Sequence, residues 1–146
     1  MSTAHDPAPF ETELQLRWSD QDAYGHVNNG RLVTLAEEAR VRALAEWADP
    51  FTPGSGALVV RTLHLEYLRP VHYAPALTAR VWVSRIGTTS FVLQHALIQD
   101  GAVAVTAEAL MVHLTADMSA TAPLSPTLRE AFEAVHRPGV SAAQDL

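Results

Sequence analysis

The chain has 146 residues and no cysteine, and its 10 basic and 16 acidic residues give a formal net charge of −6. The lack of cysteine excludes disulfides, thiol nucleophiles and cysteine zinc sites. The length and the 48% of hydrophobic residues are typical of one globular domain. The basic residues are scattered singly except for Arg40 and Arg42, which argues against a nucleic-acid partner.

The sequence has no recognisable targeting or membrane segment. The N-terminal MSTAHDPAPF lacks the basic and apolar parts of a secretory signal, and no stretch approaches the roughly 18 apolar residues of a membrane span. We therefore expect a cytoplasmic protein with no membrane partner.

The first predicted elements are a strand and a long helix. Residues 12–18, TELQLRW, alternate apolar and polar side chains, which is the period of a half-buried strand. From about residue 29 to residue 47, apolar residues recur at helical spacing. These positions are Leu32, Leu35, Ala36, Ala39, Ala43 and Trp47. Asn28 or Asn29 can cap the start of this helix, and Pro50 lies beyond its end.

After the helix the apolar period changes to two, which predicts four more strands. They are expected at residues 57–69, 76–86, 89–99 and 103–115. The links between the last three are short and contain glycine, so these strands should form an antiparallel meander of hairpins.

A short terminal helix is expected at about residues 125–136, with Ser125 as its N-cap and Pro126 at its first position. The last eight or so residues should form a loose tail. The predicted order is strand, long helix, four strands and short helix. This order is an α+β arrangement in which one antiparallel five-stranded sheet wraps the long helix.

A polar stretch, RWSDQDAYGHVNN at residues 17–29, connects the first strand to the helix. Its acids, Asp20 and Asp22, have an ordinary reading as turn or cap residues. A functional reading is also open, because unpaired backbone N–H groups at a helix start can stabilise negative charge on an oxygen. Beside such donors, Asp22 could attack an electrophilic carbonyl or activate a water. This chemistry would hydrolyse an activated acyl group.

The same stretch, together with Glu37, Ala39 and Arg40, resembles the hotdog-fold thioesterases of the 4-hydroxybenzoyl-CoA thioesterase type. Downstream, EYLRPVHYAPAL is similar to the strand-turn segment of that family, and RIGTTSF resembles the start of its next strand. The resemblance implies a single hotdog domain over residues 1–146, with its core at about 12–115.

The resemblance also implies an acyl-CoA thioesterase and roles for particular residues. Asp22 stands at the catalytic carboxylate, as nucleophile or general base, and the Gly25 N–H would polarise the thioester carbonyl. The HVNN run is similar to the plant acyl-carrier-protein thioesterases, in which a histidine at the place of His26 is catalytic. Those enzymes carry asparagine where this chain has Tyr24. Asn29 stands where bacterial relatives often have histidine.

The remaining site residues are expected to bind the substrate. They are Tyr24, Val27, Asn29, Glu37 and Ser90. Tyr24 should line the acyl pocket, and Glu37 should support the site without performing chemistry, although a solvated helix face is the alternative for this glutamate.

No metal and no cofactor are expected, because coenzyme A is part of the substrate and a product. The strand histidines, His64, His72, His95 and His113, lack the spacing of metal ligands and are expected to be core or surface residues.

An assembly of two or four copies follows from the resemblance, because family members pair their sheets edge to edge and place active sites between subunits. We expect a homodimer or homotetramer. Two other functions stay open: hydrolysis of acyl groups on acyl-carrier protein, which the net charge of −6 disfavours, and a hotdog protein that binds acyl-CoA without cleaving it. A hotdog hydratase is less favoured, because no separate Asp and His pair is found in that arrangement.

Overall fold

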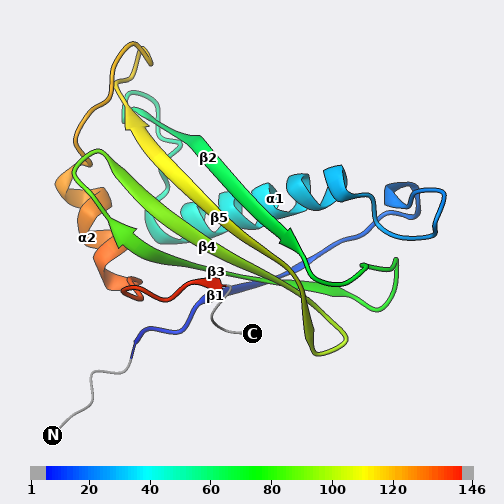
Figure 1. Cartoon of the computed structure of the whole chain (residues 1–146). Coiled ribbons are helices and arrows are strands. Elements are labelled where there is room, and N and C mark those ends of the chain that lie inside the picture. The colour runs from blue at the N-terminus through cyan, green and yellow to red at the C-terminus, as the bar shows by residue number, and fades with distance from the viewer. Residues whose placement is uncertain (1–5, 143–146) are drawn as a thin grey trace, which may run out of the picture.

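One antiparallel sheet of five strands packs a face against the long helix α1 (Figure 1). The structure is a computed structural model that describes residues 6–142. In chain order its elements are β1 (Phe10–Leu14), the 3-10 helix η1 (Trp18–Asp20), α1 (Asn29–Ala48), β2 (Ala57–Tyr67), β3 (Leu77–Ile86), β4 (Ser90–Gln99), β5 (Ala102–Leu114) and α2 (Pro126–Ala134). The spatial order β1-β3-β4-β5-β2 places β1 and β2 at the two edges. This confirms the predicted α+β arrangement and the meander of the last three strands.

The helix α1 begins where the sequence predicts. Asn28 is its N-cap, and the Oδ1 atom of Asn28 accepts a hydrogen bond from the Gly30 N–H at 2.8 Å. The helix ends at Ala48; its C-cap, Asp49, has a left-handed backbone, and Pro50 follows. Its buried face consists of Leu32, Ala36, Ala39, Arg40, Ala43 and Leu44. The small alanine side chains allow the helix to lie close to β3 and β4.

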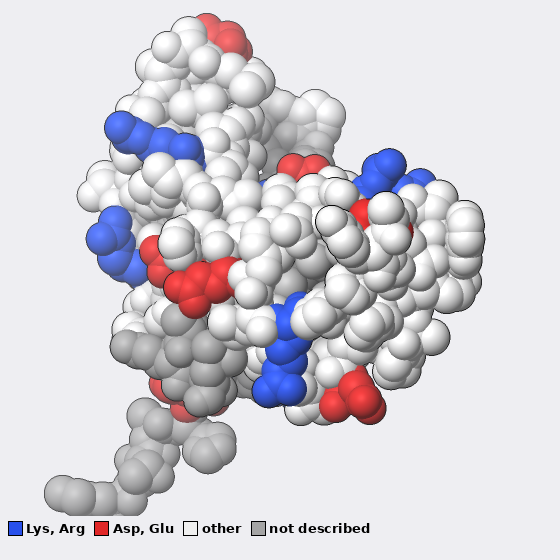
Figure 2. Space-filling view, turned by 45° about the vertical axis from the view of Figure 1, so that its right-hand side comes forward, with Lys and Arg blue, Asp and Glu red and all other residues white. Residues whose placement is uncertain are grey.

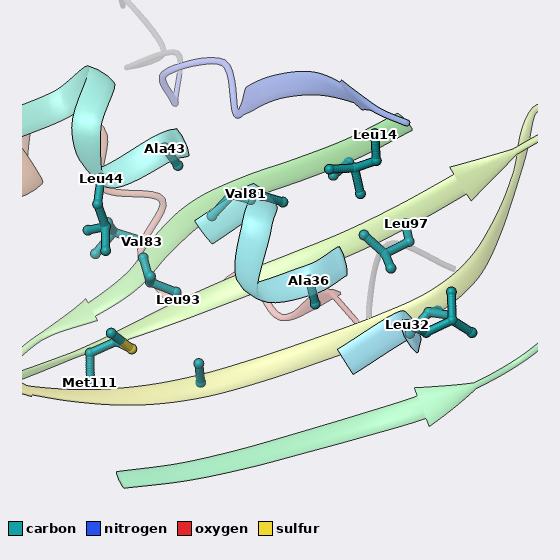
Figure 3. Close-up of a cluster of buried hydrophobic side chains, with 14 of the residues drawn as sticks. Leu14, Leu32, Ala36, Ala43, Leu44, Val81, Val83, Leu93, Leu97 and Met111 are labelled. Carbon is teal, nitrogen blue, oxygen red and sulfur yellow. The ribbon is translucent and has the colours of Figure 1, made fainter. Parts of the chain in front are cut away.

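The main hydrophobic core fills the layer between α1 and the sheet. In Figure 3, Leu32, Ala36, Ala43 and Leu44 of α1 share this layer with side chains from four neighbouring strands, β1, β3, β4 and β5. The labelled strand residues are Leu14, Val81, Val83, Leu93, Leu97 and Met111. Each large apolar side chain buried here contributes about 1.5–3 kcal/mol, so this layer fixes α1 and its start against the sheet. Within residues 6–142, no helix combines the length and the apolarity needed to cross a membrane.

The first strand is shorter than predicted. It ends at Leu14, and Trp18, which was expected to be its last inward residue, lies in η1 with 75% of its surface exposed. The reason is the length of the neighbouring strand: Leu14 pairs with Leu77, the first residue of β3, so the chain beyond Leu14 has no strand to pair with. Residues 15–28 are therefore free to form the loop that carries the polar stretch.

The segment after α2 is ordered against the sheet, so the prediction of a loose tail is wrong for residues 139–142. The Trp82 indole N–H donates to the Val140 carbonyl oxygen at 2.9 Å, and the Arg137 guanidinium lies over the Trp82 ring at 5.0 Å. Sequence periodicity did not reveal this contact because it depends on a buried tryptophan on the outer face of the sheet. The last predicted tail residues, 143–146, lie outside the described residues.

Replacing Gly56 by alanine is expected to lower the free energy of unfolding by about 2–4 kcal/mol. Gly56 has a φ of +91°, and a β-carbon there would overlap the Leu114 carbonyl oxygen and lie 2.6 Å from Nε2 of His113. Urea unfolding followed by circular dichroism measures the change. Gly54→Ala is the matched control, since Gly54 also has a positive φ of +85° but a β-carbon there would meet nothing within 4 Å. Equal losses in the two variants would show that the overlap at Gly56 is unimportant.

Candidate active site

The first acid of the polar stretch, Asp20, anchors the loop between β1 and α1. Its buried carboxylate accepts hydrogen bonds from the Arg17 backbone N–H at 2.9 Å and from the Arg17 guanidinium at 2.9 and 3.2 Å, and Arg31 lies 3.9 Å away. Burial opposes ionisation, but the hydrogen bonds from Arg17 and the charges of Arg17 and Arg31 outweigh it and hold the pKa of Asp20 below its usual value. The Asp20 carbonyl oxygen also accepts the Asn28 N–H at 2.8 Å, which ties the loop to the cap of α1.

The second acid, Asp22, is half-buried and has one carboxylate oxygen available. Its Oδ1 atom accepts the N–H groups of Tyr24 at 2.9 Å and of His26 at 3.4 Å. Its backbone N–H donates to the His26 carbonyl oxygen at 2.8 Å. No hydrogen bond to Oδ2 is made by any of the residues that the structure describes. Asp22 therefore stabilises the turn through Oδ1, as expected of a turn residue, and its Oδ2 stays available.

The backbone donors near Asp22 differ in their availability. The Gly25 N–H was expected to polarise a thioester carbonyl. It donates to the Asp22 carbonyl oxygen at 3.0 Å, so this hydrogen bond would have to break before Gly25 could donate to a substrate. Arg31 and Leu32 at the start of α1 donate to the Asn28 carbonyl oxygen. The Asn29 N–H, the first of the helix, has no acceptor among residues 6–142. This N–H lies at the N-terminus of α1, where the helix dipole favours negative charge.

The ring of His26 contacts another histidine. It packs edge to face against His72, with ring centroids 5.2 Å apart and an interplanar angle of 80°. His26 was expected to be catalytic, and the hydrogen bond that it makes to the Asp22 carboxylate comes from its backbone N–H. His72, in the loop between β2 and β3, was expected to be a core or surface residue. This contact could not be predicted from the sequence, because 45 residues separate the two histidines.

Two predicted substrate contacts near Asp22 have opposite exposures. Tyr24 is 85% exposed, so in a single chain its ring lines no enclosed pocket. Val27 is 2% exposed and belongs to the hydrophobic core, and its N–H donates to the Val71 carbonyl oxygen at 2.7 Å. The side chain of Val27 therefore anchors the loop in the core, and its contact with the substrate stays a prediction.

Two further predicted contacts, Ser90 and Glu37, lie away from Asp22 within one chain. Ser90 is the first residue of β4, whereas Gln99, the last residue of β4, is the one that bonds to the loop carrying His72. Ten extended residues span about 30 Å, so Ser90 lies at the opposite end of the sheet. Glu37 lies two turns into α1, largely exposed, with its carboxylate 3.6 Å from the buried Arg40 guanidinium. The resemblance carried over Ser90 by sequence position alone, and one chain does not bring it to the site.

A groove lies beside the anchored loop, between that loop and α1. It is lined by Leu14, Gln15, Arg17, Asp20, Arg31, Thr34, Leu35, Glu38 and Arg42. Its arginines are close to acids, so the groove carries little net charge. On the molecular face shown in Figure 2, basic and acidic side chains are likewise interspersed, and neither kind forms a continuous patch. In residues 6–142, no three His, Asp or Glu side chains lie close enough together to hold a metal ion.

Comparison with known proteins agrees with this architecture. Residues 16–132 match the model of the thioesterase-like superfamily. The long-chain acyl-CoA thioesterase FadM of Escherichia coli is 30% identical over 129 residues, which cover 85% of this chain and 97% of that protein. Among solved structures, a thioesterase from Thermus thermophilus complexed with coenzyme A and zinc is 26% identical with a TM-score of 0.79, over 88% of this chain and 94% of that one.

A predicted thioesterase from Bacillus stearothermophilus has a TM-score of 0.83 at 21% identity, over 91% of this chain and 100% of that one, and this likeness concerns the fold. The family match spans both the polar loop and all the strands that follow α1. The chain therefore belongs to the thioesterase-like superfamily and is a thioester hydrolase with the hotdog fold.

Proposed function

We propose that the chain hydrolyses the thioester of an acyl-CoA to a free acid and coenzyme A, with Asp22 as the reacting carboxylate. The observation that carries the proposal is the state of this side chain. One carboxylate oxygen is held by two backbone N–H groups, and the other accepts no hydrogen bond from residues 6–142. The same loop is tied to the cap of α1 by the hydrogen bond from the Asn28 N–H to the Asp20 carbonyl oxygen. The similarity to FadM, a long-chain acyl-CoA thioesterase, and to a thioesterase complexed with coenzyme A supports the substrate class.

The free oxygen of Asp22 can act in two ways. As a general base it takes a proton from water, whose oxygen then attacks the thioester carbon; the C–S bond breaks and the departing thiolate receives the proton. As a nucleophile it attacks the carbon itself, the thiolate leaves, and water hydrolyses the resulting anhydride. In both routes negative charge develops on the carbonyl oxygen. The Asn29 N–H and the positive end of the α1 dipole are suited to stabilise that charge.

The test is the release of free thiol from a panel of short, long and aromatic acyl-CoAs. A chromogenic thiol reagent is suitable because the chain has no cysteine of its own. Turnover of at least one acyl-CoA is expected. Binding of acyl-CoA without thiol release would instead favour a binding protein. Release only from acyl-carrier protein would favour the carrier-protein thioesterase, for which the face in Figure 2 offers no continuous basic patch.

We expect the active form to contain at least two chains, joined through the edge strand β2. Within the described residues β2 pairs with β5 alone, so its other edge is open. Apolar side chains on and next to this strand, including Val60, Tyr67 and Leu68, are more than one-third exposed. A second copy of the sheet would cover both the open edge and these side chains. Light scattering should give a mass at least twice the 15.8 kDa of one chain, and a monomer at assay concentration would contradict this expectation.

A further inference from the structure

We infer that His72 is a further positioning residue of this site, and that it holds the ring of His26 beside the loop of Asp22. The inference rests on the proposed function for its catalytic consequence. Its structural basis is the junction between two loops, residues 17–28 before α1 and residues 68–76 between β2 and β3.

The two loops are joined by a backbone bond and a ring contact. The Val27 N–H donates to the Val71 carbonyl oxygen at 2.7 Å. The adjacent residues, His26 before Val27 and His72 after Val71, place their rings edge to face. The backbone of His26 is already bound to Asp22 through both its N–H and its carbonyl oxygen. His26 is thus restrained at its backbone by Asp22 and at its ring by His72.

His72 is itself held in place by Gln99, the last residue of β4. The Gln99 side chain is 7% exposed, and its Oε1 atom accepts the His72 N–H at 2.9 Å. Its Nε2 atom donates to the carbonyl oxygens of His72 at 2.8 Å and of Pro75 at 2.6 Å. Both backbone groups of His72 are therefore bonded to one buried amide at the end of a central strand. A surface loop fixed in this manner can place a ring accurately.

The hydrogen bonding of the ring nitrogens distinguishes these two histidines from the other four that the structure describes. His64, His95, His113 and His136 each have a ring nitrogen within hydrogen-bond distance of a protein oxygen. The rings of His26 and His72 have no such partner among residues 6–142. Their nitrogens are open to water or substrate, as structural histidines in a core are not.

The test uses alanine and phenylalanine at position 72. His72→Ala removes the ring that restrains His26, and we expect kcat to fall about 2- to 10-fold with KM unchanged within about twofold. His72→Phe keeps an aromatic ring in the same place and should restore kcat. His136→Ala is the control, since it removes a histidine after α2 whose ring contacts the Ser84 carbonyl oxygen, away from both β2 and the loop of His72. Gln99→Met keeps a similar side-chain volume but loses all three hydrogen bonds of the Gln99 amide, so it should reproduce the effect of His72→Ala.

A measurement independent of activity follows the ring of His26 directly. The His26 ring resonances in a proton–carbon NMR spectrum should shift in His72→Ala, because the neighbouring ring current is lost, and should not shift in His136→Ala. Unchanged His26 resonances would overturn the inference. So would a His72→Phe variant as slow as His72→Ala, because the ring nitrogens of His72 would then be needed. If the wild-type chain cleaves no thioester, the proposed function fails while the NMR comparison still tests the contact.

Discussion

Replacing Asp22 by asparagine is expected to lower kcat for acyl-CoA hydrolysis by about 100- to 10,000-fold. Asparagine has nearly the same shape, and its side-chain oxygen can still accept the N–H groups of Tyr24 and His26 that hold the turn. It can neither take a proton from water nor attack a thioester. The loop should therefore keep its form while the chemistry is lost. Thiol release at saturating acyl-CoA measures kcat, and thermal unfolding verifies that the variant is folded.

The matched control for this variant is Asp20→Asn, two residues earlier in the same loop. Asp20 is buried and bonded to Arg17, so its loss should lower the free energy of unfolding by about 1–2 kcal/mol; the value is modest because Arg17 is 64% exposed and water screens its charge. Asp22→Asn should cost less stability and far more activity. Wild-type turnover by Asp22→Asn would remove Asp22 from the mechanism, whichever acyl-CoA is used.

The strands and helices of this fold are largely predictable because their apolar periods are regular. The long helix and the four strands after it begin and end within about two residues of the predicted bounds. Local periodicity cannot reveal where a neighbouring strand stops, which is why β1 was predicted four residues too long at its end. Nor does it reveal the irregular pairing near Val60 and Thr62, where β2 shifts its register against β5.

The candidate site was predictable only in part. The residues from Asp20 to Asn29 are contiguous in sequence, so the loop that joins them could be recognised as a unit. The two acids differ in role because they differ in surroundings. The buried Asp20 forms ion pairs with Arg17 and Arg31, whereas the half-buried Asp22 accepts hydrogen bonds from backbone N–H groups through one oxygen only. His72 could not be assigned from the sequence, because its link to His26 depends on how β4 and the loop after β2 meet in space.

Acidification from pH 6.5 to about pH 4.5 is expected to lower the free energy of unfolding by about 2–3 kcal/mol through one core histidine. His95 lies on β4 beneath α1 with 0% of its surface exposed. Burial, and then the positive charge of the buried Arg40, lower its pKa from 6.5 to about 3, against a smaller opposing effect of the Ala107 carbonyl oxygen. The neutral ring carries its hydrogen on Nδ1, which lies 3.2 Å from that carbonyl oxygen.

The sign of the pH effect follows from proton binding by the two states. Between about pH 6.5 and pH 3 the unfolded chain binds a proton at His95 and the folded chain does not, so the folded state loses stability as the pH falls. Urea unfolding at several pH values measures the slope. His95→Gln cannot titrate and should flatten it by up to about 1.4 kcal/mol per pH unit. The slope is read between pH 6.5 and about pH 4.5, because the lowered pKa of Asp20 affects stability only below its usual value of 3.8. An unchanged slope in His95→Gln over that window would mean that His95 is protonated in the folded core.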